Sequence, residues 1–308
     1  MKIAALTTAY NEPVFLPIWR QYYGQALGEE HLFVVDHGSD DGSTDNVGAA
    51  NRVRIPRGEF DEDQRCTFVS RLQASLLCYY DAVIFSDTDE ILVPDPEKYS
   101  GLVDFVTRRC EQFVTAIGLE VQHLTDTEAD IDLGRPILAQ RRYVQFAPEY
   151  CKPLVSRIPL VWKPGFHDCD LPPSIAPDLF LFHLRRMDRK LAVQRLRRMR
   201  DTKWSKNALD KQHWFHFRWS EDEFTTTLFR FSAENVKPHL VEWAEFERRL
   251  CRPAGNSDEW HRELDGVVVA IPDRFRRVIA GPEAATVALR RTTWRQQLMA
   301  KLAARERR

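Results

Sequence analysis

The sequence predicts an α/β protein in which a mixed sheet is flanked by helices and is followed by a mainly helical C-terminal region. Two observations point to this fold class. Over the first hundred residues short apolar runs alternate with amphipathic stretches, which is the pattern of parallel strands joined by crossover helices. From about residue 185 onward the pattern is mainly helical. We therefore expect an α/β domain over residues 1–184 and a helical extension over residues 185–308.

The first half of the expected domain contains three strands and two crossover helices. Short apolar runs predict strands at residues 3–8, 31–36 and 82–85. Apolar side chains at helical spacing predict helices at residues 14–27 and 65–80. Each strand runs into a cluster of polar residues. Because ligands of open α/β sheets collect beyond the carboxyl ends of the strands, these clusters should converge on one crevice.

The second half has a mixed pattern. We expect a helix at residues 102–113, a strand at residues 114–121 and a loop-rich section that reaches residue 177. In the extension, residues 189–200 and, with interruptions, residues 221–250 have helical patterns. Residues 179–183 form a further apolar, strand-like run.

Composition and charge restrict the class of protein. A hydrophobic content of 44% and a charged content of 29% are typical of a soluble globular chain. The 44 Lys and Arg residues balance 45 Asp and Glu residues, so no overall charge favours nucleic acid as a partner. The first apolar run is too short for a signal peptide, and no stretch approaches the roughly 20 apolar residues of a membrane span. We expect a cytoplasmic protein.

Two carboxylates one residue apart follow the strand at residues 82–85. Alternation along an extended chain would turn Asp87 and Asp89 to one side and Thr88 to the other. Carboxylate oxygens suit a hard divalent cation such as Mg²⁺ or Mn²⁺. The sequence therefore predicts a metal site at Asp87 and Asp89, although a solvated acidic turn is the alternative for such a short motif.

Two further motifs precede the acidic pair: Thr8-Ala9-Tyr10-Asn11-Glu12 after the first strand, and the polar stretch from Val34 to Thr44 after the second. With them the N-terminal half resembles the family 2 glycosyltransferases and their relatives with the GT-A fold. The first motif is similar to their first-strand signature, and the second is similar to their V-D-D-G-S-T-D-G-T loop, with His37 in place of the second Asp. An Arg that the family places 16 residues before the first Asp of its D-x-D motif falls on Arg71. Gln212 and Arg218-Trp219 do not have the spacing of the processive Q-x-x-R-W motif, which disfavours processive synthesis. The wording of residues 85–91, together with Lys152-Pro153, residues 165–167 and residues 182–184, is similar to bacterial enzymes of capsule and lipopolysaccharide synthesis.

The resemblance implies a Rossmann-like nucleotide-sugar domain, with a donor half over residues 1–95 and an acceptor half over residues 96–184. It implies transfer of a sugar from a nucleotide sugar, with UDP as the safest nucleotide, to a glycan or lipid-linked glycan. The donor would be bound by Thr8, Tyr10, Asn11, Asp36, Asp41, Arg71, Asp87, Thr88 and Lys152.

Several late residues are candidates for the remaining roles. His183 is expected as a third metal ligand beside Asp87 and Asp89, with His167 as its alternative. An inverting transfer needs a carboxylate that takes the proton of the acceptor hydroxyl. Asp168 and Glu120 are equal candidates for this base. A retaining transfer would need no such base.

Other classes of function and the charged tail leave alternatives open. The D-x-D pair is also similar to that of phosphatases of the haloacid-dehalogenase type, and a carbohydrate-binding module without catalysis is a third interpretation. Residues 272–308 carry ten Lys or Arg and three Asp or Glu, with apolar residues interleaved. This tail is either a basic amphipathic helix in peripheral contact with the inner face of a membrane or an ordinary helix packed on the domain.

Overall fold

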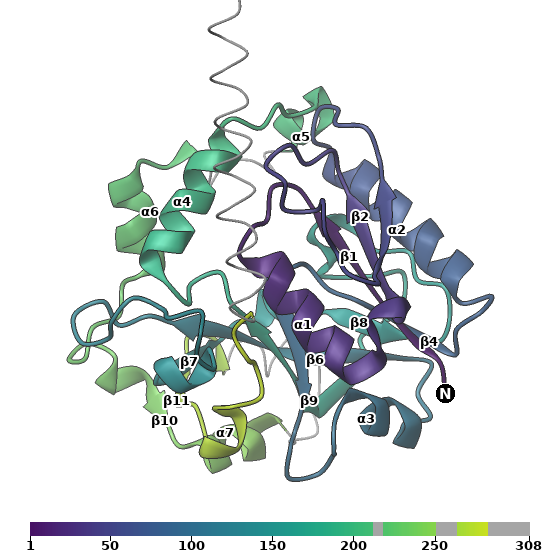
Figure 1. Ribbon diagram of the computed structural model, residues 1–308. Coiled ribbons are helices and arrows are strands. Elements are labelled where there is room, and N and C mark those ends of the chain that lie inside the picture. Colours follow the sequence, from purple (N-terminus) through teal and green to yellow (C-terminus); the bar gives the residue numbers. More distant parts are fainter. Residues whose placement is uncertain (212–217, 251–263, 283–308) are drawn as a thin grey trace, which may run out of the picture.

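The computed structural model of the protein describes residues 1–211, 218–250 and 264–282. In these residues helices flank a mixed sheet, so the predicted α/β class is confirmed (Figure 1). The main path of the sheet has the order β10-β11-β7-β6-β8-β4-β1-β2-β3, and β9 joins β6 and β5 beside it. One large apolar core fills the space between the sheet and its helices.

The N-terminal part of the sheet is parallel. Its strands are β1 (Ile3–Ala9), β2 (Leu32–Asp36), β3 (Asn51–Arg54) and β4 (Ala82–Phe85). The sequence did not indicate β3, because this edge strand is only partly covered and carries polar side chains.

Two helices make the crossovers of this part, α1 (Phe15–Leu27) and α2 (Glu62–Leu76). Helix α2 begins three residues earlier than predicted, because the carboxylate of Asp61 accepts a hydrogen bond from the backbone N–H of Gln64 and so caps the first turn. The helix also ends earlier than predicted, at Leu76.

The rest of the domain is largely antiparallel. Its elements are β5 (Glu90–Pro94), α3 (Leu102–Arg108), β6 (Phe113–Gln122), β7 (Tyr143–Phe146), β8 (Pro153–Ser156) and β9 (Ile175–His183). Strand β6 is buried along its whole length and pairs with β7, β8 and β9. Helix α3 is shorter than predicted because the backbone is already extended at Arg109. The section predicted to be loop-rich contains β7 and β8, strands of four residues that are too short to show a period.

The described residues beyond residue 184 are mainly helical, as predicted. It contains α4 (Arg189–Arg200), α5 (Lys206–Asp210), α6 (Glu221–Leu228) and α7 (Trp243–Leu250), together with the short strands β10 (Leu240–Val241) and β11 (Val268–Ala270). Because β11 pairs with β7, this region continues the same sheet. Short 3-10 helices span Glu29–His31, Leu138–Gln140, Pro148–Tyr150, Pro164–Phe166, Lys237–His239 and Asp273–Phe275.

Most of the predicted basic tail, residues 283–308, lies outside the described residues. The part of it that is described contains the 3-10 turn Asp273–Phe275, and Phe275 packs against Phe180 and Phe182 of β9. Within the described residues, none of the helices combines the length and the apolar character that a membrane span requires.

Candidate functional site

The carboxyl ends of three parallel strands lie at one edge of the sheet. Ala9 at the end of β1 pairs with Asp36 at the end of β2, and Leu6 of β1 pairs with Phe85 at the end of β4. The polar segments that follow these strands therefore start side by side, as the sequence predicts for an open α/β sheet. Residues 87–89 follow β4 directly at this edge.

Helix α1 holds the chain just before this acidic segment. The indole N–H of the buried Trp19 donates to the hydroxyl of Ser86 at 2.9 Å. The hydroxyl of Ser86 donates to the hydroxyl of Tyr23, which also accepts the backbone N–H of Leu92 at 3.0 Å. These bonds fix both ends of the segment from Ser86 to Leu92, because each buried polar group has a partner on the helix.

Asp87 and Asp89 lie in a turn rather than in an extended strand. The backbone N–H of Glu90 donates to the carbonyl oxygen of Asp87 at 3.0 Å, which closes the turn. The alternation that would have put both carboxylates on one side therefore does not operate here. The two carboxylates have different partners, and Thr88 between them is buried.

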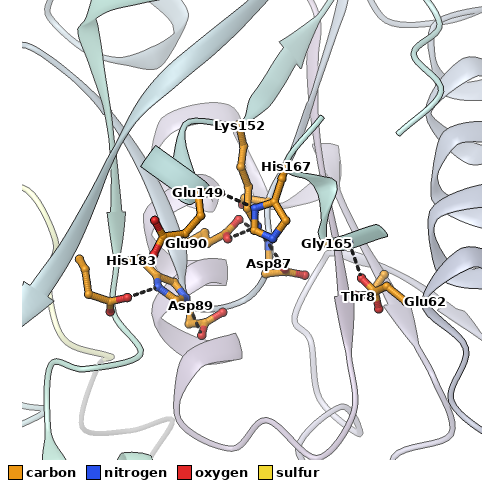
Figure 2. A network of polar contacts seen from close by, with 12 residues as sticks. Thr8, Glu62, Asp87, Asp89, Glu90, Glu149, Lys152, Gly165, His167 and His183 are labelled. Atoms are coloured by element: carbon orange, nitrogen blue, oxygen red, sulfur yellow. Dashed lines mark hydrogen bonds and ion pairs between the residues drawn. The ribbon is translucent and has the colours of Figure 1, made fainter. Parts of the chain in front are cut away.

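Asp89 lies against His183, which is the last residue of β9. Strand β9 pairs with β5 in a register that sets His183 opposite Glu90, and the backbone N–H of Leu184 donates to the carbonyl oxygen of Asp89 at 2.7 Å. Nε2 of His183 is 3.3 Å from Oδ2 of Asp89 (Figure 2). Nδ1 of His183 is 2.8 Å from Oε2 of Glu120. The ring thus lies between two carboxylates, and the three side chains come from three different segments of the chain.

Burial and charge set the protonation of this pair. Burial alone would raise the pKa of Asp89, but the guanidinium of Arg195 and the ring of His183 outweigh it and hold the pKa well below its usual value. Burial alone would lower the pKa of His183, but Glu120, Tyr150 and Asp89 together outweigh it and the pKa lies well above its usual value. Asp89 and His183 therefore each favour the charged form of the other, and a cation bound to the ring would have to displace its proton.

Arg195 of α4 is the second partner of Asp89. Its Nη1 contacts Oδ2 of Asp89, and its Nε and Nη2 lie 2.9 and 2.8 Å from Oε1 of Glu12. Glu12 belongs to the segment after β1 and is buried. Burial raises the pKa of Glu12 to about 7, although the charge of Arg195 opposes the shift.

Asp87 faces two cations on the other side of the turn. Nη2 of Arg65, on α2, lies 3.1 Å from Oδ1 of Asp87, and Nζ of Lys152 lies 3.8 Å from Oδ2. Lys152 is buried and also donates to Oε1 of Glu90 at 2.6 Å (Figure 2). Burial would raise the pKa of Asp87, but these two cations outweigh it and lower the pKa.

The residues around Asp89 fit a divalent cation in part. Among the described residues, no three side chains of the types His, Cys, Asp and Glu are grouped so that they could hold an ion. Two neighbouring ligands on an ion with bonds of about 2.1 Å are about 3 Å apart, which is close to the 3.3 Å between Asp89 and His183. Glu120 orients the ring through its other nitrogen, as carboxylates commonly do for metal-binding histidines. Mg²⁺ is usually held by one or two protein ligands together with water and phosphate oxygens, so a pair suffices.

Asp36 is closed off by its neighbours. It has no exposed surface, its Oδ1 accepts the backbone N–H of Ser39 at 2.7 Å, and its Oδ2 accepts both Arg52 and Arg54 at 2.7 Å. Both arginines belong to β3, the strand that the sequence did not indicate. The resemblance implies that Asp36 contacts the base of the donor nucleotide. In such a contact the base would have to compete with the guanidinium groups of Arg52 and Arg54 for the carboxylate.

The segment after β1 is tied to the loop after β2. The backbone of Asn11 is left-handed, with φ of 54°. Its side-chain amide donates a hydrogen bond to the carboxylate of Asp40 and accepts hydrogen bonds from the backbone N–H groups of Asp40 and Asp41. Asp41 in turn accepts the backbone N–H of Ser43 at 2.8 Å. Asn11 and Asp41 therefore shape the loop rather than project from it.

Thr8 and Tyr10, the two other residues near the end of β1 that are expected to bind the nucleotide sugar, both contact an arginine. The ring of Tyr10 lies 3.6 Å beneath the guanidinium carbon of Arg57, a cation–π contact. The hydroxyl of Thr8 accepts Nη1 of Arg65 at 3.4 Å. Thr8 thus shares with Asp87 the cation that α2 supplies.

Arg71 does not reach this group of residues. It is an exposed side chain on α2, whereas Arg65 on the same helix contacts Asp87, Glu62 and Thr8. Six residues on a helix correspond to about 9 Å along its axis and to a different face, so the two arginines cannot substitute for each other. Of the two arginines, Arg65 is the one that contacts Asp87 in the structure.

The candidate bases differ in accessibility. Glu120 is 1% exposed, and its oxygens face His183 and Arg186, so it is buried behind the histidine. Asp168 is exposed and follows His167, whose ring Nδ1 bonds the carbonyl oxygen of Glu149 (Figure 2). Burial, followed by the charge of Lys152, lowers the pKa of His167.

Sequence reasoning did not single out Arg65, Glu12 or Arg195 for a role. A signal for Arg195 exists in the pattern of α4, because it lies on the same side of the helix as Leu191 and Met199, four residues away in each direction. A charged residue in an apolar stripe indicates a buried partner. The identity of that partner is not encoded locally.

Comparison with known proteins gives distant structural matches. Neither a protein-family model nor a curated protein matches the chain. A mannosyltransferase from Pyrobaculum calidifontis in complex with GDP-Man and Mn²⁺ is 16% identical over 41% of this chain and 36% of its own length, with a TM-score of 0.28. CMP:2-keto-3-deoxy-manno-octonic acid synthetase complexed with CTP is 9% identical over 70% and 85% of the two chains, with a TM-score of 0.28. Mannose-1-phosphate geranyltransferase from Thermus thermophilus is 13% identical over 76% and 70%, with a TM-score of 0.29. At these TM-scores the matches transfer no function.

Proposed function

We propose that the protein is a divalent-metal-dependent glycosyltransferase with a GT-A fold, which moves a sugar from a nucleoside diphosphate sugar, with UDP as the nucleotide, to a glycan or lipid-linked glycan. The observation that carries the proposal is the pair of Asp89 and His183 at the carboxyl edge of the sheet, with Glu120 behind the ring. The resemblance of residues 1–95 to family 2 glycosyltransferases supports the same activity.

Asp89 and His183 would hold Mn²⁺ or Mg²⁺, and the bound ion would neutralise charge on the donor diphosphate as the nucleotide leaves. Arg65 and Lys152, the two cations that face Asp87, would stabilise the same negative charge. Thr8 and Tyr10 lie at the end of β1, where the nucleoside would bind. We assign no base contact to Asp36, since its carboxylate already binds Arg52 and Arg54.

For the acceptor we favour inversion with Asp168 as the base. Its exposed carboxylate lies on the loop beside His167, and that loop packs against the donor side through Gly165, whose backbone N–H donates to Glu62 at 3.1 Å. A base must be reachable by the acceptor hydroxyl, and this condition favours Asp168 over Glu120. Glu120 is then a positioning residue for His183.

A screen of nucleotide sugars tests the proposal. Thermal unfolding and release of nucleoside diphosphate are measured with and without Mn²⁺ for the wild type, for Asp89→Asn and for Asp130→Asn. Asp130 is a matched control because its carboxylate pairs with Lys190 at the surface. We expect one donor to stabilise the wild type and Asp130→Asn in a Mn²⁺-dependent way, and Asp89→Asn to lose that dependence.

Equal and metal-independent binding by all three proteins would overturn the proposal. Release of phosphate from p-nitrophenyl phosphate, without cleavage of any nucleotide sugar, would favour the phosphatase interpretation instead. Binding of a glycan alone, without donor or metal, would favour a carbohydrate-binding module.

A further inference from the structure

The guanidinium of Arg195 occupies one side of the carboxylate that a cation would use. Its Nη1 contacts Oδ2 of Asp89, and the same oxygen lies 3.3 Å from Nε2 of His183. A divalent ion bound to Asp89 and His183 would lie about 2 Å from this oxygen. A doubly charged ion and a guanidinium that share one oxygen repel each other strongly at such a separation. Arg195 and the ion therefore compete for Asp89.

Glu12 is an alternative ion-pair partner for Arg195. Both Nε and Nη2 of Arg195 now contact Oε1 of Glu12, whereas Oε2 of Glu12 is buried and has no hydrogen-bond partner among the described residues. A carboxylate accepts a guanidinium through two parallel bonds, one to each oxygen. A small rotation away from Asp89 would give Arg195 this bidentate pair and would satisfy the open oxygen.

The charges of the buried cluster favour such an exchange. Without an ion, Asp89 is 3% exposed and depends on Arg195 and His183 for neutralisation. With an ion in place, the carboxylate has a stronger partner and the guanidinium is no longer needed there. Because Arg195 is part of α4, the exchange connects a helix of the C-terminal region to the edge of the sheet.

We propose that Arg195 holds the cation's place on Asp89 in the donor-free protein and moves to a bidentate pair with Glu12 when the cation binds. This inference rests on the cation site of the proposed function and adds to it a residue that lowers cation affinity until the site is loaded. The roles of the two residues have opposite signs: Arg195 opposes binding of the ion, and Glu12 favours it by accepting Arg195.

Titration of Mn²⁺ into the donor-free protein, followed by calorimetry, tests this without any activity assay. Arg195→Gln should bind Mn²⁺ about 5- to 150-fold more tightly than the wild type, which is the range of typical coupling between two ligands of one site. Glu12→Gln should bind it more weakly. In the double variant the effect of Glu12→Gln should largely disappear, since no guanidinium is left to accept. Arg197→Gln is the matched control, because Arg197 lies on the same helix but pairs with Glu221 at the surface.

A second variant, Arg195→Lys, keeps the inference testable if Arg195→Gln does not fold. The lysine keeps the charge but cannot bridge Asp89 and Glu12 with a planar fork, so its Mn²⁺ affinity should lie between those of the wild type and Arg195→Gln. If the wild type binds Mn²⁺ and neither Arg195 variant binds it more tightly, this inference is overturned while the cation site stands. If neither the wild type nor the Arg195 variants bind Mn²⁺, the cation site of the proposed function falls, and this inference falls with it.

Discussion

Oδ2 of Asp89 lies 3.3 Å from Nε2 of His183, across the antiparallel pair of β5 and β9. The two residues are 94 positions apart in the chain, and the register of the pair places His183 opposite Glu90, directly after Asp89. The backbone of His183 is fixed in β9, and Asp89, in the turn just before β5, is held to it by the backbone N–H of Leu184. Such support on rigid strands is what a precise metal or catalytic site requires.

Glu120→Gln should weaken Mn²⁺ binding about 10- to 100-fold, because removal of a carboxylate behind a metal-binding histidine typically has an effect of this size. The amide cannot hold the Nδ1 side of His183 as a charged acceptor does. Calorimetric titration measures the change, and Glu221→Gln at the surface serves as the control. Loss of turnover with unchanged Mn²⁺ affinity would instead make Glu120 the base.

Arg65→Ala should lower the affinity for the nucleotide-sugar donor about 10- to 100-fold, since a hydrogen bond to a charged group contributes about 1.5–3 kcal/mol. Arg71→Ala on the same helix should change it less than about twofold, because an exposed side chain away from the site contributes little. Fluorescence or calorimetric titration with the donor compares the two. A larger loss of donor affinity in Arg71→Ala than in Arg65→Ala would instead support Arg71 as the donor-binding residue that the resemblance implies.

Gly118→Ala should destabilise the fold by about 1–3 kcal/mol, the usual effect of overpacking a core. A Cβ at this position of β6 would lie 2.5 Å from the carbonyl oxygen of Ala147 and 2.6 Å from Cβ of Tyr150. The ring of Tyr150 packs on His183 with centroids 4.1 Å apart, so Mn²⁺ affinity should fall as well. Gly58→Ala has open space around it and should be neutral in both urea unfolding and Mn²⁺ titration.

Asp36→Asn should reduce the free energy of unfolding by about 2 kcal/mol at neutral pH, because the amide leaves Arg52 and Arg54 without their carboxylate. Burial would raise the pKa of Asp36, but the N–H of Ser39 and the guanidinium of Arg52 outweigh it, and the pKa is lowered. A lowered folded-state pKa gives stability that is present above the unfolded value of about 3.9 and is lost as the pH falls through the folded value. The difference between wild type and variant in urea unfolding should therefore be constant from about pH 5 to 7 and shrink below about pH 4. A difference that grows on acidification would contradict this assignment.

The sequence by itself determined the class of fold and the place of the acidic segment. Apolar runs at residues 3–8 and 82–85 are buried strands, and such runs are local signals that depend only on neighbouring residues. The run at residues 179–183 likewise indicated a strand that ends at His183. Strands β3 and β7 escaped detection because polar residues interrupt their four-residue runs, whereas the equally short run at residues 82–85 is apolar throughout.

Only the tertiary structure decided which side chains meet. Arg195 reaches Asp89 across 106 residues, and Arg65 rather than Arg71 contacts Asp87, although both arginines belong to one helix. The turn at residues 87–89 sends the two carboxylates to different partners, which the alternation of a strand would not. Ion pairs of this kind depend on strand register, helix rotation and the packing of α4 against the sheet edge, and these are long-range properties that no local pattern of residues encodes.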